Sequence, residues 1–195
     1  SFDIRRQIRA AGMDLMCYGN SFVSILPPFR RYLYCGNPRC RFDLPLAEVY
    51  NNKEFRFRWQ NFEFHASCPK CQYNGQWHHI DRHGTTRDRI HMRRWSPHDI
   101  DIQWDLYTDE CAYIWRIPGE YRRNIREGKL FFLERCAWEV VQAIKHDANL
   151  RFDRDTLFHL KEDSFAGHLN RGWGIPRPLH NFRQAWHVQV YRRYN

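Results

Sequence analysis

Cys35-Gly36-Asn37-Pro38-Arg39-Cys40 and Cys68-Pro69-Lys70-Cys71 are the two stretches around which the first half of the chain is organised. Each carries two thiols on a short turn, and a strand-sized spacer rich in aromatic and charged residues separates them. Four thiolates in this pattern favour tetrahedral Zn(II), which imposes no ligand-field geometry and forms short bonds to sulfur. The sequence therefore predicts a zinc ribbon in which one structural Zn(II) is held by Cys35, Cys40, Cys68 and Cys71.

Two other uses of paired cysteines are possible. A redox dithiol normally lies between a strand and a helix, whereas strand-like segments surround Cys68-Pro69-Lys70-Cys71. A disulfide framework is typical of secreted chains, and seven cysteines would leave one unpaired. His65, three residues before Cys68, is the nearby residue that could replace a cysteine ligand. We interpret Cys17, Cys111 and Cys136, which lie among apolar residues, as buried small side chains.

The composition indicates a folded chain with a basic surface. Its 195 residues suffice for one domain with an insertion or for two small domains, and the 16% aromatic content favours a packed core. The formal net charge of +9 suits a nucleic-acid partner, although acidic residues are mixed in throughout. No apolar run reaches membrane-spanning length and no signal-peptide pattern is found, so we expect no membrane association and a reducing compartment. Because the chain starts at Ser1 and stops within a helical pattern, we expect it to be part of a longer protein.

Hydrophobic periodicity predicts a mixed α+β chain. Apolar residues at helical spacing indicate helices, and alternation of apolar with polar residues indicates strands. Helices are expected at 2–18, 120–127 and 130–146. Strands are expected at 21–26, 30–34, 54–59, 62–64, 76–80, 90–95, 100–104, 112–117 and 155–161, with a hairpin turn at Gln60-Asn61 and a polar loop at 82–88.

The C-terminal residues predict a glycine-rich loop followed by a helix. The loop begins at Gly167 and ends in Gly172-Trp173-Gly174-Ile175-Pro176, and proline suits the first turn of a helix. Apolar residues of this helix form one stripe, which we assign to an oligomer interface: Leu179, Phe182, Trp186, Val190 and Tyr194. Basic residues on its other faces either contact DNA or a neighbouring subunit or are simply solvated: Arg177, Arg183, Arg192 and Arg193.

Several of these motifs together resemble the portal proteins of tailed bacteriophages. Cys17-Tyr18-Gly19-Asn20-Ser21-Phe22-Val23-Ser24, after a helix, is similar to their "YGNSF" segment. Leu157-Phe158-His159-Leu160-Lys161, paired with Gly172-Trp173-Gly174-Ile175-Pro176 and a long helix, resembles their passage from wing to stem. Some large-phage portals also carry a cysteine-pair insertion. Arg93-Arg94-Trp95-Ser96-Pro97 and Glu134-Arg135-Cys136-Ala137-Trp138 fit the pattern more loosely.

The resemblance implies an α+β fold: a portal wing-like mixed domain with a zinc-ribbon insertion, leading into a long stem-type helix. Residues 1–34 would be the N-terminal helix and strand of the wing-like domain, and 35–83 the zinc-ribbon insertion. Residues 84–166 would complete the wing-like domain, and 167–195 would form the glycine-rich loop and the start of the stem-type helix. Portal subunits are far longer, so the rest of the stem, the clip and the crown are missing from this chain.

The implied function is mechanical and not enzymatic. Portal subunits form a ring, usually a dodecamer, at one capsid vertex of the virion, and genome DNA enters and leaves through its channel. Assembly in the host cytoplasm would involve other copies of the subunit, the major capsid protein, head–tail connector or neck proteins, terminase and double-stranded DNA. The ribbon would be an external insertion that stiffens the wing or touches capsid or neck proteins.

Two rival functions remain open. His78-His79-Ile80-Asp81-Arg82-His83, after paired cysteines, resembles the His-rich hairpin of HNH endonucleases, where a histidine activates water and a divalent ion holds the scissile phosphate. The downstream Asn and final His of that pattern are not found at a suitable distance, and no other catalytic set is recognisable. The second rival is a zinc-ribbon module that binds nucleic acid. Packing beside the metal is nevertheless the expected role of the aromatic stripe that could stack on bases: Phe55, Phe57, Trp59, Phe62 and Phe64.

Overall fold

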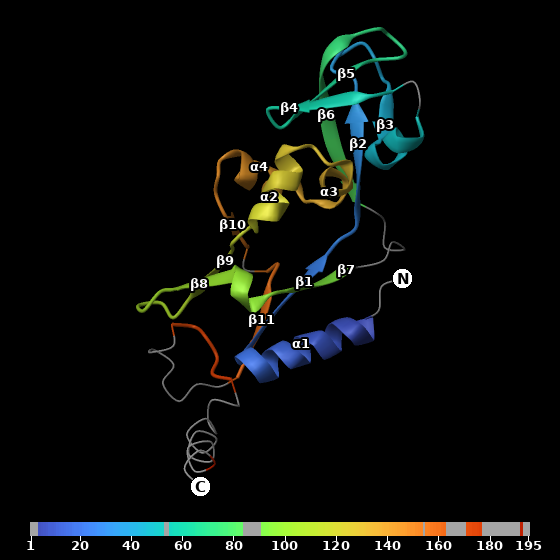
Figure 1. The fold of residues 1–195 in the computed structure, drawn as a ribbon. Coiled ribbons are helices and arrows are strands. Elements are labelled where there is room, and N and C mark those ends of the chain that lie inside the picture. The colour runs from blue at the N-terminus through green and yellow to red at the C-terminus, as the bar shows by residue number, and fades with distance from the viewer. Residues whose placement is uncertain are drawn as a thin grey trace. The chain divides into compact units, whose positions relative to one another are not determined.

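The computed structural model describes residues 4–52, 55–83, 91–153, 155–162, 171–176 and 192 (Figure 1). These residues form a mixed α+β fold with antiparallel sheets, which confirms the predicted fold class at that level. The chain divides into two compact units. The first comprises residues 1–26, 91–116 and 151–195, and the second comprises residues 27–90 and 117–150. Within the described ranges, no helix has the length and apolar character needed to cross a membrane.

The first unit is built on two small sheets. One has the strand order β11-β1-β7, with α1 packed against β1 and β7, and the other has the order β10-β9-β8. The elements are α1 (Ile4–Tyr18), β1 (Asn20–Leu26), β7 (His91–Trp95), the 3-10 turn η2 (Pro97–Asp99), β8 (Ile100–Trp104), β9 (Cys111–Trp115), β10 (Leu150–Arg151) and β11 (Phe158–Lys161). Asp14 of α1 is buried and accepts hydrogen bonds from Arg94 of β7 at 2.8 Å, which ties the helix to the sheet.

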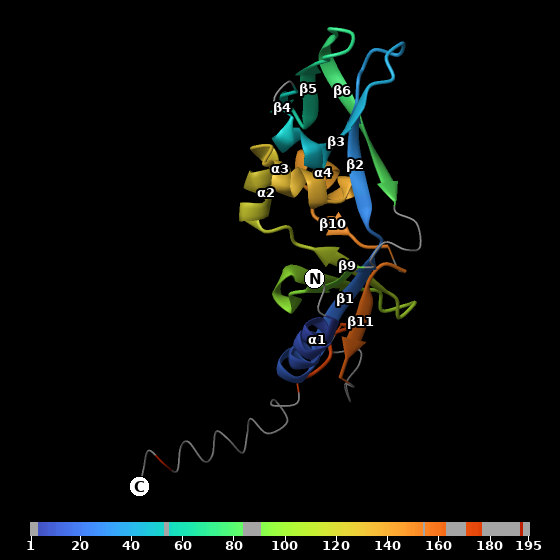
Figure 2. The ribbon, with the colours of Figure 1, turned by 90° about the vertical axis from the view of Figure 1, so that its right-hand side faces the viewer.

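The described residues of the second unit form an antiparallel sheet of order β3-β2-β6-β5-β4 and three short helices. Its elements are β2 (Phe29–Tyr34), β3 (Asp43–Pro45), the 3-10 helix η1 (Leu46–Asn51), β4 (Phe57–Gln60), β5 (Glu63–Ser67), β6 (Asn74–His83), α2 (Gly119–Arg126), α3 (Leu130–Arg135) and α4 (Trp138–Lys145). Side chains alternate across the strands, so one face carries buried Leu33, Phe64 and Trp77. Figure 2 shows α2, α3 and α4 together on one side of β2 and β6.

The expected helix 130–146 is wrong as a single element, because the structure has two helices separated at Cys136 and Ala137. Both separating residues have extended backbone, with ψ of 129° and 145°. Buried Arg31 of β2 donates hydrogen bonds to the carbonyl oxygens of Leu133 and Cys136. In a continuous helix these two carbonyl oxygens would accept from backbone amides of the following turn. At the end of α3 they accept from Arg31 instead.

Smaller differences concern turns and strand ends. The hairpin turn between β4 and β5 is centred on Asn61 and Phe62, both with positive φ (51° and 63°), one residue later than predicted. Such a two-residue turn matches the twist of antiparallel strands. β6 continues through Arg82 and His83, which were expected in a loop, because both pair with β2. β11 begins at Phe158 rather than at 155, since Asp153 and Thr156 form a turn before it.

Candidate functional site

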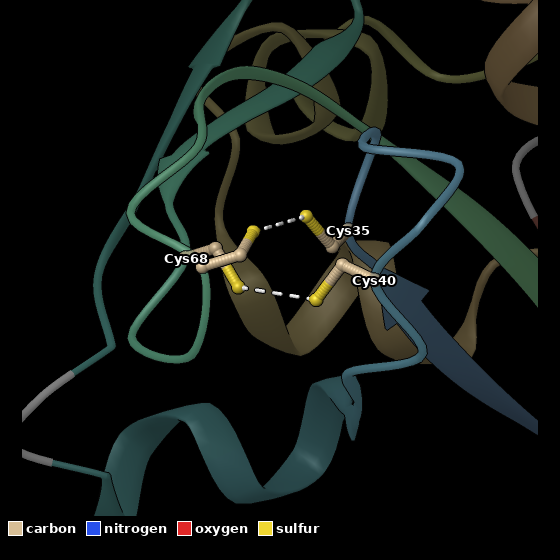
Figure 3. A group of neighbouring side chains, drawn as sticks. Cys35, Cys40 and Cys68 are labelled. Carbon is tan, nitrogen blue, oxygen red and sulfur yellow. Dashed lines mark hydrogen bonds between the residues drawn. The ribbon is translucent and has the colours of Figure 1, made fainter.

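Two turns bring four cysteine sulfurs together in the second unit. Cys35 follows β2 and Cys40 precedes β3, while Cys68 follows β5 and Cys71 precedes β6. All four Sγ atoms lie within 4.8 Å of one another, with 3.6 Å between Cys35 and Cys71 and 3.8 Å between Cys40 and Cys68. Figure 3 shows the sulfurs of Cys35, Cys40 and Cys68 turned towards a common centre.

The spacing of the sulfurs is compatible with a metal site. A tetrahedral site with metal–sulfur bonds of about 2.3 Å has sulfur–sulfur edges of about 3.8 Å. A disulfide would need about 2 Å between two sulfurs, far less than the 3.6 and 3.8 Å that separate these pairs of Sγ atoms. The geometry therefore fits one cation bound by Cys35, Cys40, Cys68 and Cys71, and leaves the identity of the metal open.

Backbone amides of the turns point at the sulfurs. The amide of Asn37 donates to Cys35 Sγ at 3.4 Å, two residues back along the chain. The amides of Phe42 and Tyr73 stand in the same relation to the cysteines two residues before them. The side-chain amide of Asn37 adds a contact to Cys71 Sγ at 3.7 Å. N–H donors in these positions stabilise negative charge on sulfur and orient metal ligands.

The acidity of the thiols also bears on the site. Burial raises the pKa of Cys35 to about 12, while the backbone N–H of Tyr73 lowers the pKa of Cys71 to about 7. Four thiols this close repel one another when ionised, whereas a divalent cation would favour all four thiolates and release their protons on binding. Four thiolates in this cluster are therefore favoured when a cation is bound and disfavoured when none is.

The remaining cysteines and His65 lie elsewhere. His65 is on β5 with its Nε2 3.7 Å from a carboxylate oxygen of Glu63, and it is not a member of the four-cysteine cluster. Cys136 is buried as predicted, and Cys111 is partly buried. The prediction for Cys17 is wrong, because its side chain is exposed. Ala11 and Asp14 define the inward side of α1, and at 100° per residue position 17 lies about 90° from their midpoint, at the edge of that side.

The histidine run that suggested a nuclease forms part of β6. Successive residues of the strand point to opposite faces, so His78 and His79 are separated by the sheet. Asp81 accepts two hydrogen bonds from Arg31, at 2.7 and 2.6 Å, and the ring of His79 lies 3.6 Å from that of Trp138. Burial lowers the pKa of His79. In the part of the chain that the structure describes, the four cysteines are the single group of three or more His, Cys, Asp or Glu close enough to bind a metal.

A second polar site, which sequence reasoning missed, centres on Asn20 in the first unit. Asn20 Oδ1 accepts hydrogen bonds from the backbone N–H of Gly174 at 2.7 Å and from His159 Nε2 at 3.0 Å. Its Nδ2 donates to the carbonyl oxygens of Tyr18 and Gly174 at 2.7 and 3.0 Å. We call Asn20, His159 and Gly174 the Asn20 junction. Gly174 has no room for a side chain, because an added Cβ would lie 2.2 Å from the carbonyl oxygen of Gly19.

Aromatic packing encloses this junction. The ring of His159 stacks on Phe22 with centroids 4.4 Å apart, and Trp173 meets Phe22 edge-on at 5.9 Å. Burial lowers the pKa of His159 to about 4, so the ring is neutral at pH 7. With Nε2 donating to Asn20, Nδ1 accepts from the hydroxyl of Tyr113 at 3.1 Å. The available sequence signal was that Asn20 and His159 are polar residues at or beside strand-like segments. Periodicity cannot show that two residues 139 positions apart are hydrogen-bonded to each other.

Comparison of the chain with protein-family models, with curated proteins and with solved structures finds no match. Of the residues predicted at the oligomer interface and at the DNA or intersubunit contact, Arg192 is described and is exposed. The others lie outside the described residues: Leu179, Phe182, Trp186, Val190, Tyr194, Arg177, Arg183 and Arg193.

Proposed function

We propose that this chain is part of a bacteriophage portal subunit, a structural protein that forms a ring at one capsid vertex. The observation that carries the proposal is the Asn20 junction. The "YGNSF" segment supplies β1, residues 157–161 supply β11 paired with it, and the loop 172–176 supplies Gly174. Three motifs that resemble portals separately, and that lie up to 154 positions apart, thus meet at one side chain.

The junction also suits a mechanical role. It fixes the glycine-rich loop to the end of α1 and to β1 through four hydrogen bonds of Asn20. A stem-type helix that follows this loop would therefore leave the unit from a defined point. The subunit would act without catalysis in a ring of about twelve copies, in the virion, with capsid, neck and terminase proteins as partners and double-stranded DNA in the channel.

We propose that the four-cysteine site holds structural Zn(II). Four thiolates with amide donors to the sulfurs form a closed ligand set, which is typical of structural rather than catalytic zinc. Elemental analysis of anaerobically purified protein should give one zinc per chain. Replacement by Co(II) should give the visible absorption bands of a tetrahedral tetrathiolate, and protein without zinc or other bound metal would refute the assignment.

The portal proposal is tested by the size of the assembly. Mass measurement and particle imaging of the purified full-length protein should show a large closed ring. The same preparation should not cut DNA with Mg(II) or Mn(II), and His79→Ala and His83→Ala should leave this unchanged. A monomer that cuts DNA in a His79-dependent manner would contradict the portal proposal and support the HNH-like nuclease.

A further inference from the structure

The five-stranded sheet of the second unit has a face that the helices do not cover. α3 and α4 approach the side that carries Arg31, Asp81 and His79, as the bonds of Arg31 to α3 and the packing of His79 on Trp138 show. Residues of the opposite parity alternate with these and are mostly exposed. We call this side the outer face, and it includes Arg30, Tyr32, Tyr34, Arg58, His65, Gln76, His78, Ile80 and Arg82.

Aromatic rings occupy the middle of the outer face. Tyr34 on β2 and His78 on β6 are register partners, with ring centroids 5.3 Å apart, and Tyr34 is 40% exposed. Tyr32, the next outward residue of β2, carries the guanidinium of Arg82 4.2 Å from its ring centroid. Tyr34 and His78 are both exposed and border a cavity that Trp138, Gln142 and Lys145 of α4 also line, whereas Arg82 covers one face of the Tyr32 ring.

Basic residues lie on both sides of the rings. Arg30 and Arg82 are register partners at one end of the β2–β6 pair, and Arg58 lies on β4 beside His65. Two carboxylates lie nearby: Asp43 binds Arg82 at 2.8 Å, and Glu63 lies 3.7 Å from His65. Arg30, Arg58 and Arg82 outnumber these two carboxylates, so the net charge of these residues is positive.

A groove of about 740 Å³ runs over the β4–β5–β6 part of this face. Among its lining residues are Arg56, Arg58, Gln60, His65, Ser67 and Asn74. Two arginines at alternate positions of one extended segment are about 7 Å apart, a separation suited to successive phosphates of an extended strand. The amide and hydroxyl groups can hydrogen-bond to base edges.

We propose that the outer face binds single-stranded nucleic acid, with Arg56 and Arg58 on the phosphates and Tyr34 and His78 stacked on bases. A positive groove beside exposed aromatic rings is the arrangement that recognises unpaired strands. A duplex keeps its bases stacked within the helix, so these rings would contribute nothing to its binding. The site goes beyond the proposed portal channel, which passes duplex DNA, and it lies in the unit that contains the cysteine cluster.

The test is fluorescence anisotropy of the full-length protein with labelled oligothymidine, oligouridine and a duplex of equal length. The parent should prefer the single strands, and its affinity should fall steeply with salt. Arg58→Glu should weaken binding at least about tenfold and flatten the salt dependence, because a phosphate contact is lost. Tyr34→Ala should weaken binding about 5- to 150-fold with the salt slope unchanged, because stacking is lost.

Arg9→Glu is the matched control, since Arg9 is exposed on α1 in the other unit and the change in charge is the same. It should bind like the parent, and every variant should keep the parent's metal content and circular dichroism. Preference for the duplex, Tyr34→Ala binding like the parent, or equally tight binding of labelled polyglutamate would overturn the proposal. The mass of each sample separates the two proposals. A ring that ignores single strands contradicts this site alone, and a monomer that binds them contradicts the portal alone.

Discussion

Arg31 is the buried charge that joins the sheet of the second unit to its helices. The residue is 1% exposed, and its side chain binds both carboxylate oxygens of Asp81 as well as the carbonyl oxygens of Leu133 and Cys136. Its guanidinium also lies 5.1 Å from the ring centroid of Trp138. A planar guanidinium can satisfy all these acceptors at once, which a lysine ammonium cannot.

Arg31→Met should therefore destabilise the protein strongly. It leaves the Asp81 carboxylate without its charge partner and the end of α3 without donors, so a loss of about 3–5 kcal/mol in the free energy of unfolding is expected. Urea denaturation followed by circular dichroism measures it. Arg30→Met is the matched control, since Arg30 is exposed one position earlier, and it should change stability by less than about 0.5 kcal/mol. Equal stability of the two variants would show that Arg31 is not required.

His159 should make stability depend on pH. Burial, aided by the charge of Lys161, lowers its pKa from the usual 6.5 to about 4 in the folded state. Between these values the unfolded chain binds more protons, so this contribution is fully present above pH 6.5 and is lost as the pH falls towards 4. Thermal unfolding followed by circular dichroism at several pH values should show the decline.

His159→Gln supplies the control for that prediction. Glutamine can still donate to Asn20 and does not titrate, so the variant should lose the part of the pH dependence between pH 6.5 and 4 that the histidine causes. General acid denaturation by carboxyl groups remains in both proteins. Parallel pH profiles for parent and variant would show that His159 does not titrate differently in the two states.

At the scale of elements, alternation and turn chemistry predicted most strands, because each pattern is local. β1, β2, β7 and β8 lie within one residue of the expected ranges. The break between α3 and α4 could not be predicted, since apolar residues continue at helical spacing across Cys136. The side chain that binds the carbonyls at this break, Arg31, lies about a hundred positions earlier in the chain.

The cysteine cluster was predictable for a related reason. Each turn carries its own pair of thiols, so two local patterns specify four residues. The Asn20 junction offers no such repetition, because its residues come one from each of three distant segments. Sequence periodicity indicates which residues face inwards and not which inward-facing residues meet.

Cys68→Ser should remove the metal and loosen the elements that it joins. Three thiolates bind more weakly than four, and the two turns lie at the ends of β2 and β5. Hydrogen exchange should rise sharply across residues 30–80, while β1 and β11 keep their protection and any helix expected from the sequence after Pro176 is unaffected. Cys17→Ser is the control, since Cys17 is exposed on α1 and should retain one metal per chain. Unchanged metal content in Cys68→Ser would contradict the four-cysteine assignment.

At the scale of the whole molecule, the chain passes between the two units after residues 26, 90, 116 and 150. The expected ribbon, residues 35–83, lies inside the second unit, which also contains residues 117–150. The packing of His79 on Trp138 joins the ribbon range to this later segment, and the hydrogen bond of Arg31 to Cys136 joins β2 to it. Local patterns place a ribbon in the sequence but do not show which later segment packs against it.

The ring itself is tested at the C-terminal stripe. The sequence places Leu179, Phe182, Trp186, Val190 and Tyr194 on one side of an expected helix, a surface too apolar to face water along its whole length. In a ring we expect this stripe to meet a neighbouring subunit. Trp186 is the largest side chain of the stripe and lies midway along it. If its indole is buried, Trp186→Ala should lower the free energy of unfolding by about 3–5 kcal/mol.

Part of that loss should appear as failure to close the ring. Sedimentation and native mass measurement of the full-length variant beside the parent separate the two effects, because a defect in assembly changes mass and a defect in folding changes the melting temperature. Arg183→Glu is the companion variant: it should disturb assembly or DNA passage without unfolding the subunit, since it alters charge and leaves the apolar stripe intact. If Trp186→Ala assembles like the parent and only melts earlier, the stripe is core within one subunit and the ring interface lies elsewhere.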